Sequence, residues 1–205
     1  MTSPRDASPI ASSKPSLVLA SESPRRLQLL AQAGIVPEAV RAADIDESIH
    51  RKEEPRAYAA RVAAEKVRTV AAQWSGAPAV FLAADTIVAL GRRVLPKAAD
   101  GEQVRECLEM LSGRAHRVLT AVAAVGTDRK LRTRMVETRL SLDRLDAAAI
   151  GAYVQCGEGV GKAGGYAVQG RAEIFVRRLS GSYSNVVGLP LRETMSLLRA
   201  AGYPC

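Results

Sequence analysis

The sequence predicts an α/β fold built on a mixed, twisted sheet, and three observations support it. Strand-like and helix-like segments alternate along most of the chain, which is typical of α/β proteins. Residues 79–90 form a long apolar run that predicts a buried strand. Residues 115–126 and 131–142 predict two strands joined by a turn at 127–130. An antiparallel hairpin among alternating elements favours a mixed sheet.

Composition predicts one globular unit over residues 17–205, because a chain of 205 residues that is 47% hydrophobic can bury a substantial core. Residues 1–16 differ, since serines and prolines are mixed there without apolar periodicity. We therefore expect a flexible N-terminal tail. The three cysteines are odd in number and far apart, so reduced thiols are expected rather than disulfides or a zinc site.

The chain carries a net charge of +8, which is compatible with nucleic acid, an anionic membrane or an anionic small substrate. Its basic pairs are isolated and aromatic residues make up only 4%, so a nucleic-acid partner is not expected. No apolar run is long enough to span a membrane, and residues 1–16 lack the apolar core of a secretion signal. A cytoplasmic protein without a membrane partner is the prediction.

The junction between residues 17–20 and the next helix places two cations at a helix start, where positive charge is unfavourable. Ser23 is a suitable helix N-cap, and Pro24 suits the first helical position. Arg25 and Arg26 follow in the first turn, where the helix dipole disfavours each cation by roughly 0.3 to 1 kcal/mol. Free amides of a helix start and two guanidiniums suit a phosphate or carboxylate. An exposed basic turn is the alternative reading.

Other elements follow from periodicity and from turn residues. A glycine-rich stretch at 157–165 predicts a mobile loop, which contains Lys162. Asp85 lies within the apolar run 79–90 and needs a partner there, because an unpaired buried carboxylate costs several kcal/mol. The remaining expectations are helices at 54–74, 101–111, 146–155 and 190–201, a turn at 91–93, a strand at 174–176 and a loop at 181–188.

Five stretches together resemble the Maf family of nucleoside triphosphate pyrophosphatases. They are LVLASESPRRLQLL from residue 17, AADTIV at 83–88, LSGRAH at 111–116, KAGGYAVQG at 162–170 and GSYSNVVGLPL at 181–191. The resemblance implies a Maf/ITPase-like fold of two α/β lobes around a nucleotide cleft, a homodimer and a divalent metal. It also implies hydrolysis of nucleotides to a monophosphate and pyrophosphate. ADT followed by KAGGYAVQG is similar to the branch that acts on dTTP and UTP.

The resemblance implies that a set of basic and hydroxyl side chains binds the phosphates of the nucleotide. A triphosphate needs cations and oriented amides in place before it binds. The predicted phosphate-binding residues are Ser21, Ser23, Arg25, Arg26, Lys97 and Lys162. Without the resemblance, the favoured interpretation of Lys97 is a solvated lysine. Two departures from the family pattern concern loop geometry: Gly161 replaces the usual aspartate, and Ala98 replaces the proline that usually follows the lysine.

Asp85 is the predicted catalytic acidic residue, with Lys97 in support. The resemblance implies a proton acceptor for the attacking water, although an isolated aspartate has a pKa of about 3.9. A divalent cation makes this chemistry easier, and oxygen ligands suit Mg²⁺ or Mn²⁺. Asp85 and Glu47 are the predicted metal ligands. A solvated loop glutamate is nearly as good a reading for Glu47.

The base is predicted to be selected by polar side chains. A pyrimidine imide edge has one donor between two acceptors, which the amide of Gln169 can complement. Thr86 and Arg25 are implicated by resemblance. Lys66 reads as an ordinary helix residue, and His116 as a structural one. A purine-preferring or broad pyrophosphatase, and a cell-division or nucleic-acid-binding regulator, are the alternative functions.

Overall fold

A single mixed sheet of seven strands organises the molecule in the computed structural model, which describes residues 15–205. The expected flexible tail lies outside the described residues except for its last two, and Ser16 already begins the first strand. The strand order is β2-β1-β3-β5-β6-β7, with β4 paired to β3. The strands are β1 (Ser16–Leu19), β2 (Ala39–Val40), β3 (Ala79–Leu90), β4 (Arg93–Leu95), β5 (Ala115–Val125), β6 (Leu131–Leu142) and β7 (Val176–Ser180).

The sheet is mixed, as predicted, because β1 runs parallel to β2 and β3 whereas the other neighbours are antiparallel. The predicted hairpin is confirmed as β5 and β6, which pair from Ala115–Ser141 to Val125–Leu131. The helices are α1 (Pro24–Gln32), α2 (Pro55–Gln73), α3 (Gly101–Leu111), α4 (Ala147–Cys156), α5 (Tyr183–Val187) and α6 (Leu191–Ala200).

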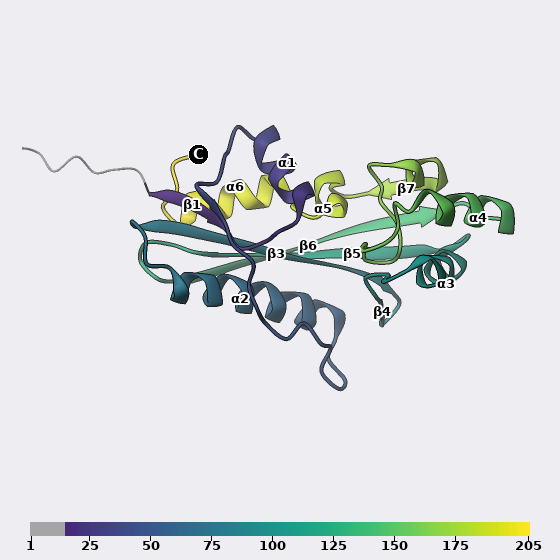
Figure 1. The fold of residues 1–205 in the computed structure, drawn as a ribbon, viewed down its shortest axis with the longest axis horizontal. Helices are drawn as coiled ribbons and strands as arrows, with labels where there is room; N and C mark the ends of the chain where they lie inside the picture. The colour runs from purple at the N-terminus through teal and green to yellow at the C-terminus, as the bar shows by residue number, and fades with distance from the viewer. Residues whose placement is uncertain (1–14) are drawn as a thin grey trace, which may run out of the picture.

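The helices cover the sheet unequally. Figure 1 shows α2 on one side of the sheet and α1, α5 and α6 on the other. The core divides in the same way, because successive strand residues point to opposite faces. Leu17 and Leu19 join the cluster beneath α1 and α6, whereas Val18 and Ala20 join the cluster beneath α2.

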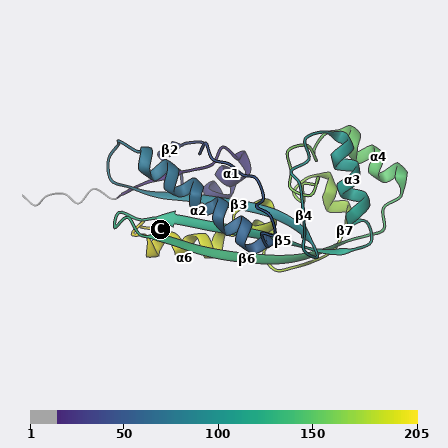
Figure 2. The same cartoon turned by 90° about the horizontal axis from the view of Figure 1, so that it is seen from below.

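Two lobes share this sheet. Figure 2 shows α1, α2 and α6 gathered at one end and α3, α4, β4 and β7 at the other, while β5 and β6 run through both. The expected two-lobed arrangement is therefore present, with the long central strands as the connection. None of the helices described is both long enough and apolar enough to cross a bilayer.

Two short segments differ from the sequence-based expectation. The predicted strand at 174–176 is wrong, because Arg171–Phe175 forms a 3-10 helix and the strand begins at Val176. The predicted loop at 181–188 is also wrong, because it contains α5. The buried side chain of Asn185 fastens this helix to the sheet: its Nδ2 donates to the Val118 carbonyl, 3.1 Å away, and to Thr138 Oγ1 at 3.0 Å. These partners lie on distant strands, so local periodicity does not reveal them.

Candidate active site

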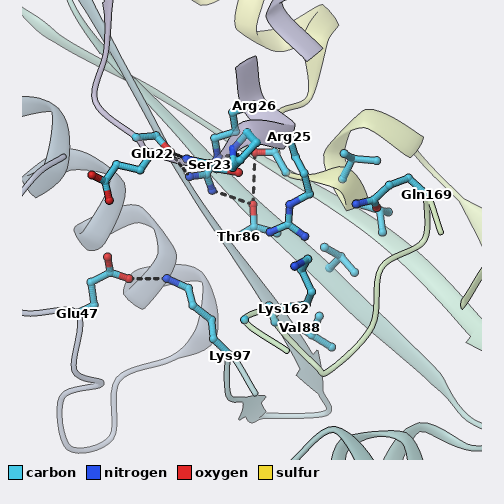
Figure 3. Close-up of a pocket in the computed structure, with 18 of the residues that line it drawn as sticks. Glu22, Ser23, Arg25, Arg26, Glu47, Thr86, Val88, Lys97, Lys162 and Gln169 are labelled. Carbon is cyan, nitrogen blue, oxygen red and sulfur yellow. Dashed lines mark hydrogen bonds and ion pairs between the residues drawn. The ribbon is translucent and has the colours of Figure 1, made fainter. Parts of the chain in front are cut away.

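A pocket of about 500 Å³ lies between the two lobes and gathers most of the predicted site residues (Figure 3). One wall comes from the β1–α1 junction and the loop that precedes α2, and the other from the glycine loop and the end of α5. The predicted residues that line it are Ser21, Ser23, Arg25, Arg26, Glu47, Thr86, Lys97, Lys162 and Gln169. Asp85 is the one predicted residue that does not line it.

The β1–α1 junction forms at the predicted residues but without the predicted cap bond. Ser23 precedes α1 and Pro24 begins it, yet the Ser23 side chain makes no capping hydrogen bond. Instead, the amide of Ser23 donates to Ser21 Oγ at 3.3 Å. The Ser23 hydroxyl is therefore not committed to the helix start and lines the pocket.

Arg26 fastens the start of α1 to the sheet and to the end of α5. Its Nε donates to the Gly188 carbonyl at 2.9 Å, and its Nη1 donates to Ser21 Oγ at 2.8 Å. Its Nη2 lies 3.4 Å from Thr86 Oγ1. Burial lowers the pKa of Arg26, and Asp85 acts against that shift by favouring the charge. Arg26 thus presents a desolvated, oriented guanidinium at the floor of the pocket.

Arg25 and Lys162 bring two positive charges together across the pocket. Figure 3 shows their side chains pointing toward the same space beside Thr86, from α1 and from the glycine loop. Burial lowers the pKa of Lys162, and the charge of Arg25 lowers it further. Within residues 15–205, neither side chain has an acidic partner. Like charges held close without an anion between them form a site prepared for phosphate.

The glycine loop is tied down, which differs from the mobile loop that the sequence predicts. The Ala98 amide donates to the Lys162 carbonyl at 3.1 Å, and the Gly161 amide donates to the Ala98 carbonyl at 2.7 Å. The Gly164 amide donates to the Pro96 carbonyl at 2.9 Å. Ala98 therefore uses an N–H that a proline would lack. Lys162 is positioned through the backbone.

Gly164 shows why the loop needs glycine. Its φ is +68°, which side chains rarely adopt, and an added Cβ would lie 2.9 Å from Val88. The loop backbone therefore approaches β3 more closely than any side chain permits. This contact places the segment 161–169 against the central strand that carries Asp85 and Thr86.

Asp85 and Thr86 are adjacent in sequence but lie on opposite faces of β3. The neighbours of Thr86 on its face, Ala84 and Val88, belong to the core beneath α1 and α6. The neighbours of Asp85 on its own face are Ala83 and Ile87, which belong to the core beneath α2. Asp85 is only 1% exposed.

Lys66 links buried Asp85 to the pocket. Its Nζ lies 3.1 Å from Asp85 Oδ1 and 2.7 Å from Glu47 Oε1. Glu47 Oε2 in turn lies 2.6 Å from the Nζ of Lys97. Two carboxylates and two ammonium groups thus alternate from the interior of the sheet to the exposed Lys97. Figure 3 shows the outermost pair, Glu47 and Lys97.

Glu47 is held ionised in this chain of charges. Although partial burial raises its pKa, hydrogen bonds from Lys66 and Lys97 outweigh burial and lower it to about 2. The Tyr58 hydroxyl fixes the loop by donating to the Glu47 carbonyl at 2.8 Å. Glu47 is therefore a preformed anionic group at the edge of the pocket.

Lys66 is the functional candidate that sequence reasoning missed. Val62, Lys66 and Val70 are spaced four residues apart on the buried face of α2. A lysine in such an apolar stripe needs a buried anion, and Asp85 is the aspartate of a buried strand. A lysine on the apolar face of a helix, together with an aspartate in a buried strand, was therefore the sequence signal for this ion pair.

The opposite end of the pocket is apolar with a polar rim. Its walls include Val88, Val118 and Val168. Gln169 lies exposed at the rim, and within the described residues its amide has no hydrogen-bond partner. Thr86 Oγ1 is 3.0 Å from Thr120 Oγ1, so its hydroxyl joins the network around Arg26. This end can enclose a planar ring while the amide reads its edge.

His116 is structural, as expected. It is buried, and its Nε2 lies 2.7 Å from the Tyr166 hydroxyl. Burial lowers the pKa of His116 to about 4, so the ring is neutral near pH 7. Tyr166 lines the pocket, and His116 therefore supports the wall from behind.

The family model described as Maf-like protein matches residues 16–201. The chain belongs to the Maf family. A Maf relative from Brucella abortus (strain 2308), named dTTP/UTP pyrophosphatase, is 54% identical over 192 residues, which are 92% of each chain. A relative of the same name from Caulobacter vibrioides is 55% identical over 190 residues, covering 92% of this chain and 97% of the relative.

One solved structure similar to this Maf chain is the nucleoside-triphosphatase, or dITP/XTP pyrophosphatase, of Mycobacterium abscessus. It has a TM-score of 0.45 and 19% identity, and the match covers 90% of this chain and 93% of that one. The sequence matches extend over both lobes, so they include every side chain that lines the pocket.

Proposed function

We propose that this Maf protein hydrolyses dTTP and UTP to the nucleoside monophosphate and pyrophosphate. The observation that carries the proposal is the convergence of Arg25 and Lys162, two cations without an acidic partner in the described chain, on the space beside Thr86. Buried Asp85 is linked to the same pocket through Lys66 and Glu47. Relatives named dTTP/UTP pyrophosphatase at 54 to 55% identity support the same reaction.

The triphosphate binds between the lobes. Arg25 and Lys162 contact its phosphate oxygens from opposite walls, and the repulsion between them is relieved when the anion enters. Lys97 leaves Glu47 to bind a phosphate oxygen, because a half-exposed lysine exchanges partners readily. Arg26 keeps its hydrogen bonds and supplies positive charge from the floor of the pocket. The phosphates are thus positioned for attack at the α phosphorus.

Asp85 accepts the proton of the attacking water. Its Oδ2 is buried and has no hydrogen-bond partner among residues 15–205, so this oxygen is available to accept a proton. Lys66 binds the other oxygen and fixes the carboxylate. Water reaches Asp85 when Lys66 and Glu47 shift, since these two side chains separate it from the pocket.

A divalent cation fits this carboxylate pair. Asp85 and Glu47 both contact Lys66, and Asp85 Oδ2 is an orphaned acceptor. The described residues contain no cluster of three or more His, Cys, Asp or Glu suited to a metal. This donor set suits Mg²⁺ or Mn²⁺, which bind through one or two carboxylates and fill their remaining positions with phosphate and water. When bound, the cation offsets phosphate charge and makes water more acidic.

The apolar end of the pocket takes the base. The walls that include Val88, Val118 and Val168 exclude water from the ring. Gln169 pairs with the imide edge as donor and acceptor, and a base with a different edge leaves this amide unpaired. The polar rim therefore selects the base, whereas the charged end of the pocket carries out the hydrolysis.

A homodimer and a cytoplasmic location remain predictions from the sequence. Light scattering coupled to gel filtration tests the first, since a dimer of this 21.8 kDa chain has twice its mass. Fractionation of cells that express the tagged chain tests the second.

The function is tested with purified protein, Mg²⁺ or Mn²⁺, and a panel of canonical triphosphates. Pyrophosphate and the monophosphate should appear in equal amounts, fastest from dTTP and UTP. Release of inorganic phosphate alone would contradict cleavage at the α phosphorus. Faster hydrolysis of ATP or GTP would favour the purine alternative, and no turnover of any nucleotide would refute the proposal.

A further inference from the structure

A second cavity, of about 600 Å³, lies at the C-terminal end of α2. It is bounded by the end of α2, the start of β3 and the β5–β6 turn. None of the residues described lines both this cavity and the nucleotide pocket. Its volume is within the range of small-molecule sites.

The apolar wall of this cavity is built around Trp74. Trp74 packs edge-to-face on Phe81, with ring centroids 6.0 Å apart, and its Nε1 donates to the Ala77 carbonyl at 2.9 Å. Gly76 permits this arrangement, because an added Cβ would lie 2.6 Å from the indole. The loop after α2 therefore holds the indole in place while Val125 and Leu131 complete the apolar surface.

Two arginines give the cavity a positive charge. Arg68 on α2 and Arg129 in the β5–β6 turn both line it, and no aspartate or glutamate of the described chain does. Neither guanidinium has an ion-pair or hydrogen-bond partner within residues 15–205. The cavity thus combines an aromatic wall with unneutralised charge, which complements a planar anion.

Arg129 occupies a conformation that ordinarily belongs to glycine or asparagine. Its φ is +58°, and a side chain in this region costs on the order of 1 kcal/mol. The cost is tolerated at a residue that lines the cavity. Local backbone preference therefore does not account for an arginine at this position.

We propose that this cavity is a second ligand site for a small anion with a planar apolar body, such as an aromatic carboxylate, sulfonate or phosphate. The ring lies against Trp74 and Phe81, and the anionic group lies between Arg68 and Arg129. This site is independent of the proposed pyrophosphatase reaction, because it shares no residue with the nucleotide pocket.

Trp74 provides the direct test, because it is the single tryptophan of the chain. Full-length protein is titrated with 8-anilinonaphthalene-1-sulfonate, and energy transfer from Trp74 to the probe is measured. We expect saturable transfer with one site. N-phenyl-1-naphthylamine has the same rings without the sulfonate and should bind about fivefold more weakly.

Two variants remove the charge without altering the apolar wall. Arg68→Gln and Arg129→Gly should each weaken binding of the sulfonate about fivefold. Glycine also suits φ +58°, so Arg129→Gly should not lower the melting temperature. Arg134→Gln is the matched control, because Arg134 is an exposed arginine of β6 outside the cavity and should leave binding unchanged.

Ala72→Glu tests the location of the site, because Ala72 is an exposed helical residue that lines the cavity. The added carboxylate should abolish energy transfer while the protein stays folded. Transfer that persists in Ala72→Glu would place the probe elsewhere and overturn the proposal. Equal affinity of both probes, or unchanged affinity in both arginine variants, would also overturn it.

Discussion

The ammonium of Lys66 lies 3.1 Å from Oδ1 of Asp85, and both side chains are buried. One charged partner comes from the apolar face of α2 and the other from the central strand β3. A buried ion pair contributes little net stability, but loss of one partner leaves a costly unpaired charge. The pair therefore constrains both the fold and the chemistry beside the pocket.

Asp85→Asn should retain the fold and lose turnover. The amide has nearly the same shape but cannot accept a proton as the carboxylate does, so kcat should fall by at least about a hundredfold. The measurement is pyrophosphate release at saturating UTP, with circular dichroism to verify folding. Asp128→Asn is the control, since Asp128 pairs with Arg132 on the surface and should leave kcat unchanged. Full activity in Asp85→Asn would remove Asp85 from the mechanism.

Lys66→Met should destabilise the free protein and make it more responsive to a divalent cation. Removal of the ammonium leaves Glu47 and Asp85 as neighbouring carboxylates, with an expected cost of about 3 kcal/mol in the free energy of unfolding. Added Mg²⁺ should then raise the melting temperature more than it does in the wild type. Lys66→Arg, which keeps the charge, serves as the comparison. Equal Mg²⁺ responses in Lys66→Met and the wild type would contradict a metal at this carboxylate pair.

Lys162→Ala should weaken substrate binding without lowering stability. The variant loses a phosphate contact, so KM for UTP should rise about tenfold, whereas removal of a charge near Arg25 relieves repulsion in the free protein. The melting temperature should therefore stay the same or increase while KM rises. Arg178→Ala removes an exposed cation of β7 and should change neither quantity. An unchanged KM in Lys162→Ala would exclude Lys162 from phosphate binding.

His116 should make the protein less stable in acid. Burial lowers the pKa of His116 to about 4 in the folded chain, compared with about 6.5 in the unfolded chain. Between these values the unfolded chain binds a proton that the folded chain does not, so stability falls as pH decreases from 6.5 toward 4. The expected loss is on the order of 2 to 3 kcal/mol.

Urea unfolding at pH values of about 7 and about 4.5 measures this loss in the wild type and in His116→Gln. The variant lacks the titrating ring, so its stability should change less over the same interval. Identical pH dependence in both proteins would show that His116 does not cause the loss.

Much of the fold could be predicted because its long elements depend on local pattern. The apolar run at 79–90 and the amphipathic helix at 101–111 have the predicted limits, and Asp146 caps α4 as expected. Short elements could not be predicted, since α5 depends on Asn185 bonding to two distant strands. For the same reason, the glycine loop was predicted to be mobile although backbone bonds to residues 96–98 hold it.

By itself, the sequence determined the chemical inventory of this protein: the ordered family motifs, the cations at the start of a helix and an aspartate in a buried strand. Tertiary structure decided which of these groups meet. The pleat of β3 turns Asp85 away from Thr86, and the packing of α2 brings Lys66 to Asp85. Such contacts join residues far apart in sequence, and their energies depend on burial and distance that no local pattern contains.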